Sequence, residues 1–193
     1  MKQNKKIAVT GGIGSGKSLF CSILKKMGYI VFSCDEIYSE MIEETDFLTR
    51  LQNRFPDCFP NGKLNKTLLA ELVFRNREEK AALDRLTHPL IMKRLLDKMK
   101  PHNLSFAEVP LLYEGGFEGL FDGVIALVRN KEERIKAVMA RSGLTEKEVL
   151  HRMENQFDPV LLSDKNCLII ENHGSEADLK RKAEKILKDI RYE

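Results

Sequence analysis

One short segment near the start of the sequence constrains the fold more than any other. Residues 11–18 read GGIGSGKS, which satisfies the phosphate-binding pattern G-x-x-x-x-G-K-[ST] at every required position. The apolar run Ile7 to Thr10 precedes this segment, and residues with helical spacing follow it. The segment therefore lies between a predicted buried strand and a predicted helix. This context predicts a P-loop, whose backbone N–H groups bind phosphate oxygens at the positive end of the helix.

The motif gives most of its residues a role in binding ATP. We expect Lys17 to reach the β- and γ-phosphates and the Ser18 hydroxyl to ligate Mg²⁺. The backbone around the nucleotide is predicted to come from the rest of the motif and the residue after it: Gly12, Gly14, Ser15, Gly16 and Leu19. The alternative, a glycine-rich turn without a ligand, is disfavoured by the complete match and by its flanks.

Apolar runs alternate with amphipathic stretches along the chain. The buried-strand candidates are residues 7–10, 29–32, 104–109, 123–128 and 167–170. Each has an amphipathic stretch before or after it, which indicates an α/β protein with a mainly parallel sheet. The predicted fold is a three-layer α/β sandwich of the P-loop NTPase type, with a five-stranded parallel sheet.

Two stretches without strand signals interrupt this alternation. Residues 35–102 are predicted to form a helical insertion, in which one helix begins at His88-Pro89 because proline suits a first helical turn. Residues 131–159 form a second helical excursion, where Thr145 and Glu148 fit a capping box. We expect one domain whose core is residues 1–34, 103–130 and 160–193.

Composition and patterning exclude several classes of protein. The 32 basic and 29 acidic residues are interleaved, so no nucleic-acid-binding surface is indicated. The longest apolar stretches, such as residues 124–128, are too short to span a bilayer, and no signal peptide is evident. The four cysteines are far apart and are expected to be reduced. These features predict a cytoplasmic protein with no membrane partner.

Further motifs separate the classes of P-loop protein. The chain has no D-x-x-G, and residues 130–133 depart from the guanine motif N-K-x-D at Glu133, which disfavours a GTPase. Residues 106–109 are a poor match to the acidic strand end of a motor ATPase. A kinase of a small molecule is the remaining class.

Asp35 is the predicted general base. It follows the second predicted strand, and ligands bind beyond the carboxyl ends of strands in sheets of this kind. A carboxylate there can accept a proton from an acceptor hydroxyl and align its oxygen for in-line attack. The alternative is that Asp35 caps a helix over residues 36–43. Its position in the sequence does not decide between the two, and one residue could do both.

Four segments together resemble the dephospho-CoA kinase family. They are Thr10 to Ser18 followed by Asp35, Leu72 to Ile91 with its L-T-H-P-L-I ending, Pro110-Leu111-Leu112-Tyr113-Glu114, and Ile170 to Gly174. They occur in the family's order and spacing from residue 7 to about residue 190, so the resemblance covers nearly the whole chain. It implies transfer of the ATP γ-phosphate to the ribose 3′-hydroxyl of dephospho-coenzyme A, the last step of coenzyme A synthesis.

The resemblance also implies roles for residues outside the loop. Asp35, Lys17 and Arg141 would be catalytic, with Arg141 and Arg152 as lid arginines that clamp phosphate. Asn172 and Gly174 would frame the adenine. The acceptor would contact residues of the insertion and of the strand ends: Thr10, Asp35, Lys66, His88, Pro110, Leu111, Leu112 and Glu114. Duller alternatives remain open, since His88 could cap a helix, Asn172 could make a turn and Lys66 could be simply exposed.

The chain departs from the family pattern in the lid. An arginine expected at position 137 is replaced by Ala137, while Arg134 lies nearly one turn earlier. After Gln156, which matches the family's glutamine, a basic residue is expected near Leu162, and Lys165 could substitute. Two other functions stay open: a nucleoside monophosphate or shikimate kinase, and an ATP-binding switch without transfer. The expected partners are ATP and dephospho-CoA alone, with a monomer favoured.

Overall fold

A computed structural model of the chain describes residues 4–154, 156 and 167–192. It divides the chain into two compact units, which we describe separately: Met1–Phe32 with Met99–Glu193, and Ser33–Lys98. Leu162 and Lys165, which the sequence analysis singled out, lie outside the described residues. In the part of the chain that is described, no helix has both the length and the apolar character needed to cross a bilayer.

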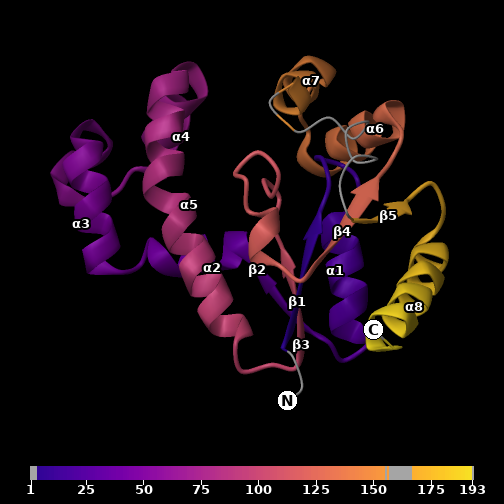
Figure 1. The fold of residues 1–193 in the computed structure, drawn as a ribbon. Helices are drawn as coiled ribbons and strands as arrows, with labels where there is room; N and C mark the ends of the chain where they lie inside the picture. The colour runs from indigo at the N-terminus through magenta and orange to yellow at the C-terminus, as the bar shows by residue number, and fades with distance from the viewer. Residues whose placement is uncertain (1–3, 155, 157–166, 193) are drawn as a thin grey trace. The chain divides into compact units, whose positions relative to one another are not determined.

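The first unit is built on a five-stranded sheet in the order β2-β3-β1-β4-β5 (Figure 1). The strands are β1 (Lys5–Thr10), β2 (Ile30–Ser33), β3 (Leu104–Glu108), β4 (Gly123–Val128) and β5 (Leu168–Glu171). The central strand β1 pairs in parallel with β3, with Ala8 opposite Ala107, and with β4, with Val9 opposite Ile125. The predicted α/β fold with a five-stranded parallel sheet is confirmed. Its short apolar strands are buried on both faces, as is usual for parallel sheets.

Two helices of the first unit, α1 (Lys17–Lys26) and α8 (Glu176–Tyr192), pack on the sheet and against each other (Figure 1). Each buries one apolar stripe of its surface, as the helical spacing of its apolar residues requires. The resulting core includes Phe20 and Leu24 of α1, Leu179 and Leu187 of α8, and Phe106 of β3. Because α1 is fixed in this way, the phosphate-binding loop at its start has a firm base.

Helices α6 (Lys131–Ser142) and α7 (Glu146–Glu154) form a smaller cluster in the same unit. Their buried contacts come from Ile135, Val138 and Val149, and Ile13 packs against this cluster. The predicted capping box at the start of α7 is present, with the Thr145 amide donating to Glu148 Oε2 at 2.8 Å. The apolar side of the cluster therefore contacts the phosphate-binding loop directly.

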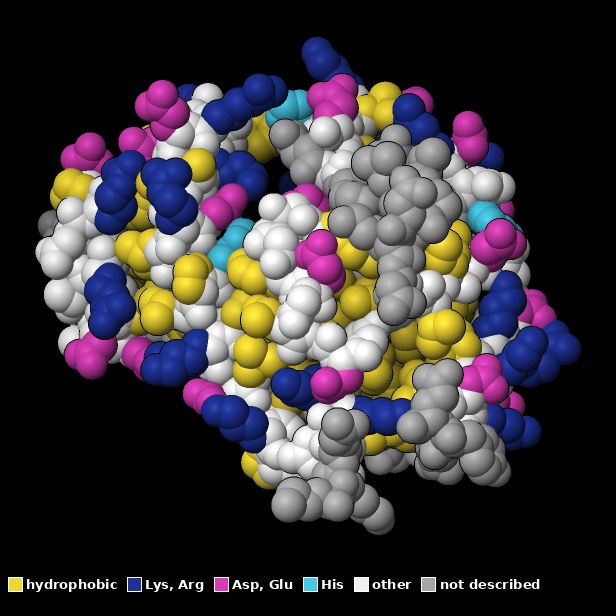
Figure 2. All heavy atoms as spheres, viewed as in Figure 1, with side chains coloured by type: hydrophobic (Ala, Val, Ile, Leu, Met, Phe, Trp, Pro, Cys, Tyr) yellow, Lys and Arg dark blue, Asp and Glu magenta, His cyan; other side chains and the backbone are white. Residues whose placement is uncertain are grey.

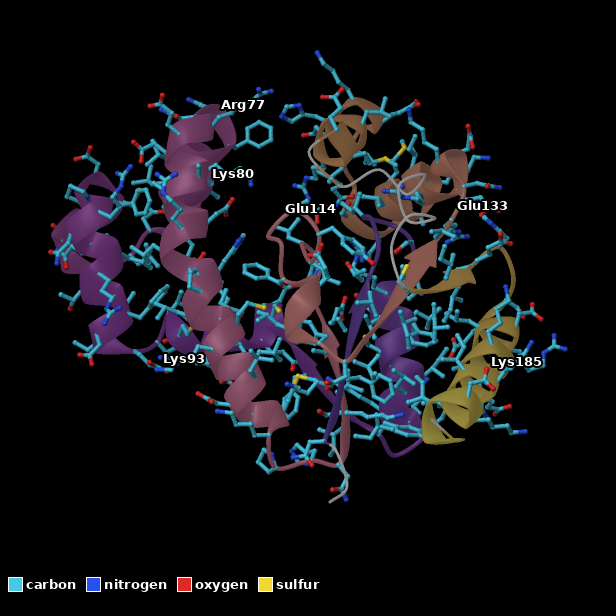
Figure 3. All side chains as sticks on the ribbon, viewed as in Figure 1. Arg77, Lys80, Lys93, Glu114, Glu133 and Lys185 are labelled. Carbon is cyan, nitrogen blue, oxygen red and sulfur yellow. The ribbon has the colours of Figure 1, made fainter. Side chains whose placement is uncertain are left out.

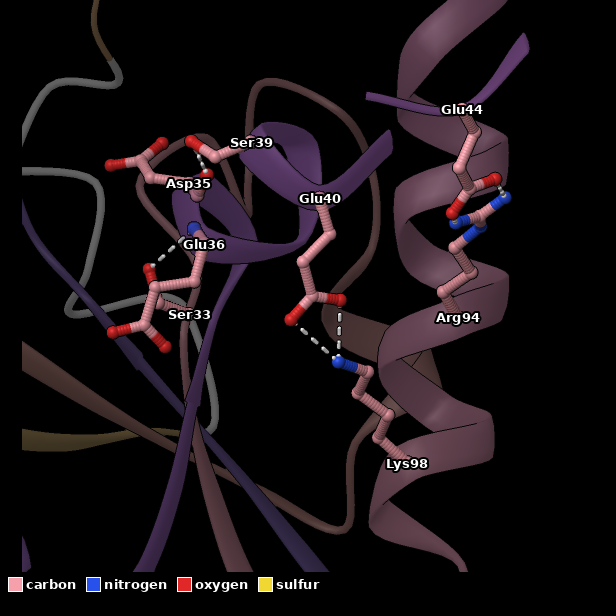
Figure 4. A network of polar contacts seen from close by, with 8 residues as sticks. All are labelled: Ser33, Asp35, Glu36, Ser39, Glu40, Glu44, Arg94 and Lys98. Atoms are coloured by element: carbon pink, nitrogen blue, oxygen red, sulfur yellow. Dashed lines mark hydrogen bonds and ion pairs between the residues drawn. The ribbon is translucent and has the colours of Figure 1, made fainter. Parts of the chain in front are cut away.

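The second unit is helical throughout its described length, as the sequence predicts. Its α-helices are α2 (Cys34–Met41), α3 (Thr45–Arg54), α4 (Lys66–Arg75) and α5 (Arg77–Met99). Two ion pairs join α2 and the residues after it to α5: Glu40 with Lys98 at 2.6 Å, and Glu44 with Arg94 (Figure 4). The Glu44 pair is bidentate, and the hydrogen bonds from Arg94 lower the pKa of the Glu44 carboxyl.

The prediction that a helix begins at His88-Pro89 is wrong. The helix α5 begins at Arg77, where Asn76 Oδ1 accepts from the amides of Glu78 and Glu79 at 2.9 and 3.2 Å. Pro89 lies inside the helix, where it removes one backbone donor without ending it. His88 is therefore in a helix interior and caps nothing.

Phe106 offers a test of the core of the first unit. Its side chain is fully buried on β3 and meets Tyr29 edge-on, with ring centroids 5.5 Å apart. We expect Phe106→Ala to lower the free energy of unfolding by about 3–5 kcal/mol, as for other buried phenylalanines. The matched control is Phe74→Ala, because Phe74 is 64% exposed. Urea unfolding would contradict this account if both variants unfolded at the same midpoint.

Candidate functional site

The phosphate-binding loop connects β1 to α1 through left-handed backbone. Gly16, the residue before α1, has φ 100° and ψ 15°, a conformation that side chains with a Cβ rarely adopt. A Cβ there would also collide with the side-chain amide of Asn172. Glycine is therefore required at this position both by backbone conformation and by close approach, which explains part of the motif.

Lys17 lies folded over the loop that it ends. Its Nζ donates to the Gly11 carbonyl at 2.6 Å and to the Gly12 carbonyl at 3.3 Å. The Ser15 amide also bonds to the Gly12 carbonyl, at 3.1 Å, which closes the turn. A lysine ammonium, a helix N-terminus and a tight glycine-rich turn thus meet at one place, and together they form an anion-binding site.

Glu108 is a site residue that the sequence analysis missed. The Ser18 hydroxyl donates to Glu108 Oε1 at 2.8 Å, from the last residue of β3. The segment was dismissed as a poor match to an acidic strand end, although Glu108 closes a predicted strand. That position was the available signal, since β3 lies directly beside β1. The sequence alone does not show which strand is the neighbour of β1.

The donor set of Ser18 and Glu108 fits Mg²⁺. Both side chains offer oxygen atoms, which this hard cation prefers, and it usually keeps several waters and substrate phosphates as its other ligands. No group of three or more His, Cys, Asp or Glu side chains suited to a metal occurs among the described residues. A full protein cage is therefore not available there, whereas a phosphate-bound Mg²⁺ needs only one or two protein ligands.

Asn172 supports the loop from the end of β5. It is buried, its amide N–H donates to the Val128 carbonyl at 2.8 Å, and its side-chain Nδ2 donates to the Ser15 carbonyl at 2.8 Å. The predicted role in framing adenine stays a prediction, since the observed contact is to the loop. Gly174 follows in the turn before α8, where a Cβ would collide with the Asp178 carboxylate.

The lid helices also contact the loop, through both polar groups of Ile13. Arg134 Nε donates to the Ile13 carbonyl at 2.8 Å, and the Ile13 amide donates to Gln156 Oε1 at 2.7 Å. Arg134 is only 7% exposed, and burial lowers the pKa of its guanidinium. The sequence left its role open, although it lies seven residues before Arg141, two helical turns along the same face of α6.

The two arginines expected to clamp phosphate occupy exposed positions. Arg141 lies in the last turn of α6, and Arg152 lies near the end of α7. Their predicted role as phosphate clamps stays a prediction. Ala137, the position at which a further arginine was expected, is half-buried in α6.

The strand ends carry the acceptor-side residues of the first unit. Thr10 is buried at the end of β1, and the turn after β3 holds Pro110, Leu111, Leu112 and Glu114. Glu114 is exposed on this turn (Figure 3), whereas the Leu112 side chain is fully buried. Leu112 therefore belongs to the core, and its backbone alone is left for any contact with a substrate.

Asp35 is not the cap of α2. Ser33 Oγ accepts from the Glu36 amide at 3.4 Å, and Ser33 is the residue that precedes the helix. Asp35 is exposed in the first turn of the same helix, where its backbone carbonyl accepts from Ser39 at 2.9 Å (Figure 4). The capping alternative is therefore wrong, and the carboxylate remains at the start of a helix, where negative charge is favourable.

Two other predicted acceptor residues lie in the second unit. Lys66 is the first residue of α4 and is exposed, with its Nζ 4.0 Å from Glu43 Oε1. His88 lies 3.4 Å from Asp84 Oδ1, and burial lowers the pKa of its imidazole despite that carboxylate. Lys80 (Figure 3) shares Asp84 at 2.8 Å, so the three side chains form a row along α5.

The fold and the loop define a P-loop phosphotransferase-like α/β protein. A Sinorhizobium meliloti gluconokinase shares this fold, with a TM-score of 0.56 at 11% identity over 100% of this chain and 98% of that one. The family model described as dephospho-CoA kinase matches residues 6–178, and the chain belongs to that family.

Individual relatives agree with this assignment. The chain is 35% identical to the dephospho-CoA kinase of Thermus thermophilus, over 95% of this chain and 91% of the relative. It is 31% identical to the dephospho-CoA kinase of Helicobacter pylori, over 95% and 96%. The structure of dephospho-CoA kinase from Campylobacter jejuni matches with a TM-score of 0.70 at 28% identity, over 97% of each chain.

Asn172 gives a test of how the loop is supported. Asn172→Ala would leave the Ser15 carbonyl without its side-chain donor, and an unsatisfied buried polar group costs about 1–3 kcal/mol. We expect a lower free energy of unfolding and weaker binding of ATP, measured by urea unfolding and calorimetry. The control is Asn130→Ala, because Asn130 is exposed and its side chain does not cap α6. Unchanged ATP affinity in Asn172→Ala would refute a supporting role.

Proposed function

We propose that this chain transfers the γ-phosphate of ATP to the ribose 3′-hydroxyl of dephospho-coenzyme A, the last step of coenzyme A synthesis. The observation that carries the proposal is the complete phosphate-binding loop, with Lys17, Ser18 and Glu108 together, in a chain that matches the dephospho-CoA kinase family over residues 6–178. The relatives named above bear that activity in their names, and here it becomes a proposal for this chain.

On the nucleotide side, the loop and Lys17 bind and orient the phosphates. The backbone at the start of α1 and the Lys17 ammonium would stabilise the negative charge that develops on the transferring group. Ser18 and Glu108 would hold Mg²⁺, which when bound neutralises charge on the β- and γ-phosphate oxygens. Arg141 would add a further positive charge from the lid.

On the acceptor side, Asp35 acts as the general base. Its carboxylate accepts the proton of the 3′-hydroxyl while that oxygen forms a bond to the γ-phosphorus. The bond from the γ-phosphorus to the bridging oxygen breaks, and ADP leaves. A carboxylate suits this task because it lies in the first turn of α2, where the helix fixes its backbone.

The remaining predicted residues would bind the acceptor and exclude water. The second unit, with Lys66 and His88, would hold the acceptor nucleotide, together with Thr10, Pro110, Leu111 and Glu114 from the strand ends. Residues 131–159 would act as a lid, because phosphoryl transfer to a hydroxyl competes with hydrolysis. We propose a cytoplasmic monomer that uses ATP and dephospho-CoA. Lys and Arg lie among Asp and Glu on the face seen in Figure 2, in keeping with small-molecule partners.

The substrate assignment is tested with a panel of acceptors. Release of ADP would be measured by a coupled assay with MgATP and dephospho-CoA, adenosine, AMP or shikimate. We expect fast release with dephospho-CoA alone, and slow release without an acceptor because water is excluded. Preference for AMP or shikimate would assign another kinase activity, and no release with any acceptor would favour an ATP-binding switch.

The role of Asp35 is tested by Asp35→Asn. The amide keeps the size of the side chain but accepts a proton poorly, so we expect kcat to fall by about 10²–10⁴-fold with little change in ATP affinity. Glu36→Gln is the matched control, since Glu36 is the next exposed carboxylate of α2. Turnover of Asp35→Asn close to that of the control would remove Asp35 from the base role.

A further inference from the structure

Arg134 is a buried cation that lies against the phosphate-binding loop. Its Nε has one good hydrogen bond, to the Ile13 carbonyl at 2.8 Å, and its Nη2 has a long one, 3.4 Å to Gln156 Oε1. A guanidinium has five N–H donors, so most of the donor capacity of Arg134 is not used by these contacts. With only 7% of the residue exposed, water does not readily supply the rest.

The described residues provide no counter-charge for Arg134. The shift of its pKa has burial as its cause, with no contribution from an acidic neighbour. Other arginines of the chain are paired, such as Arg94 with Glu44 and Arg129 with Glu133 at 3.1 Å. Burying a cation without an anion is unfavourable, so the arrangement calls for a negatively charged ligand at this place.

The position of Arg134 indicates which anion this is. The backbone N–H groups at the start of α1 surround the inner phosphates of a nucleotide, and the lysine reaches the outer ones. In this chain the Lys17 ammonium lies on the carbonyls of Gly11 and Gly12, at the other end of the loop. Arg134 Nη2 occupies the space that a Cβ on Gly12 would fill. Two cations therefore approach Gly12, next to the outer phosphates.

We propose that Arg134 binds the terminal phosphate of ATP through its remaining guanidinium N–H groups. It would supply from α6 the positive charge that Ala137 does not. This inference deepens the proposed function and depends on it only in taking a nucleoside triphosphate as the ligand. Arginine suits the role because its planar fork contacts two phosphate oxygens at once, while Nε keeps its bond to Ile13.

A purely structural role makes a different prediction. If Arg134 only held the Ile13 carbonyl, its removal would disturb the whole loop, and ATP and ADP would lose affinity by the same factor. If it contacts the terminal phosphate, ATP alone loses that contact. The ratio of the ADP and ATP dissociation constants therefore separates the two roles.

The experiment compares Arg134→Gln and Arg134→Lys with the control Lys136→Gln. Lys136 is an exposed cation of the same helix, two residues away. Binding of MgATP and MgADP to the full chain would be measured by calorimetry, with thermal unfolding as a check on folding. We expect Arg134→Gln to weaken ATP binding by about 10- to 100-fold, as for loss of a charge-assisted hydrogen bond, and ADP binding by much less. Arg134→Lys should restore part of the loss, and the control should match the native chain.

Two outcomes would overturn the proposal. One is equal loss of ATP and ADP affinity in Arg134→Gln, which would assign Arg134 to holding the loop. The other is unchanged affinity for both nucleotides. If Arg134→Gln does not fold, Arg134→Lys decides, because it keeps the charge and loses the fork; an unchanged ADP-to-ATP ratio in it would then count against the proposal. No acceptor is present in these measurements, so a failure of dephospho-CoA phosphorylation would leave their result unaffected.

Discussion

The phosphate-binding loop depends on hydrogen-bond donors that satisfy its outward-facing carbonyls. The Ser15 carbonyl accepts from Asn172, the Ile13 carbonyl from Arg134, and the Gly11 carbonyl from Lys17. These donors come from β5, α6 and the loop's own helix, which are remote from one another in sequence. Because each carbonyl is bonded within the protein, the turn is formed before any phosphate arrives, and preorganisation of this kind is the main source of electrostatic catalysis.

The same contacts join the lid helices to the loop. Ile13 is bonded through both of its backbone polar groups, to Arg134 and to Gln156, and its side chain packs on the apolar cluster of α6 and α7. A movement of α6 would therefore have to break these bonds or carry the loop with it. Lid position and loop shape are thus physically coupled in this chain, through one residue of the motif whose identity the motif leaves open.

The sequence predicted what local pattern determines. The loop, the five strands and the capping box of α7 each depend on neighbouring residues, so their signals are complete within a short window. Glu108 was missed because its contact with Ser18 requires β3 to lie beside β1, which only the folded sheet establishes. Leu112 was expected at the substrate because the turn after β3 lies at the rim, but the side chain points into the core.

The start of α5 shows how two local signals can compete. Pro89 fits a first helical turn, but Asn76 caps the helix thirteen residues earlier and the apolar spacing continues through the proline. One missing N–H in a helix of 23 residues costs less than ending a helix whose face is already packed. The stronger cap and the longer apolar face therefore decide where the helix begins, and proline adapts.

The acidic residues along α2 illustrate how structural and chemical tasks are divided. Ser33 satisfies the helix start, while Glu40 pairs with Lys98 and Glu44 with Arg94, which joins this segment to α5. Asp35 stands in the same helix, yet among the described residues its carboxylate takes part in none of these pairs. A general base must be held in place by its backbone while its oxygens stay available to a substrate. By giving the cap to a serine and the ion pairs to glutamates, α2 leaves Asp35 in that condition.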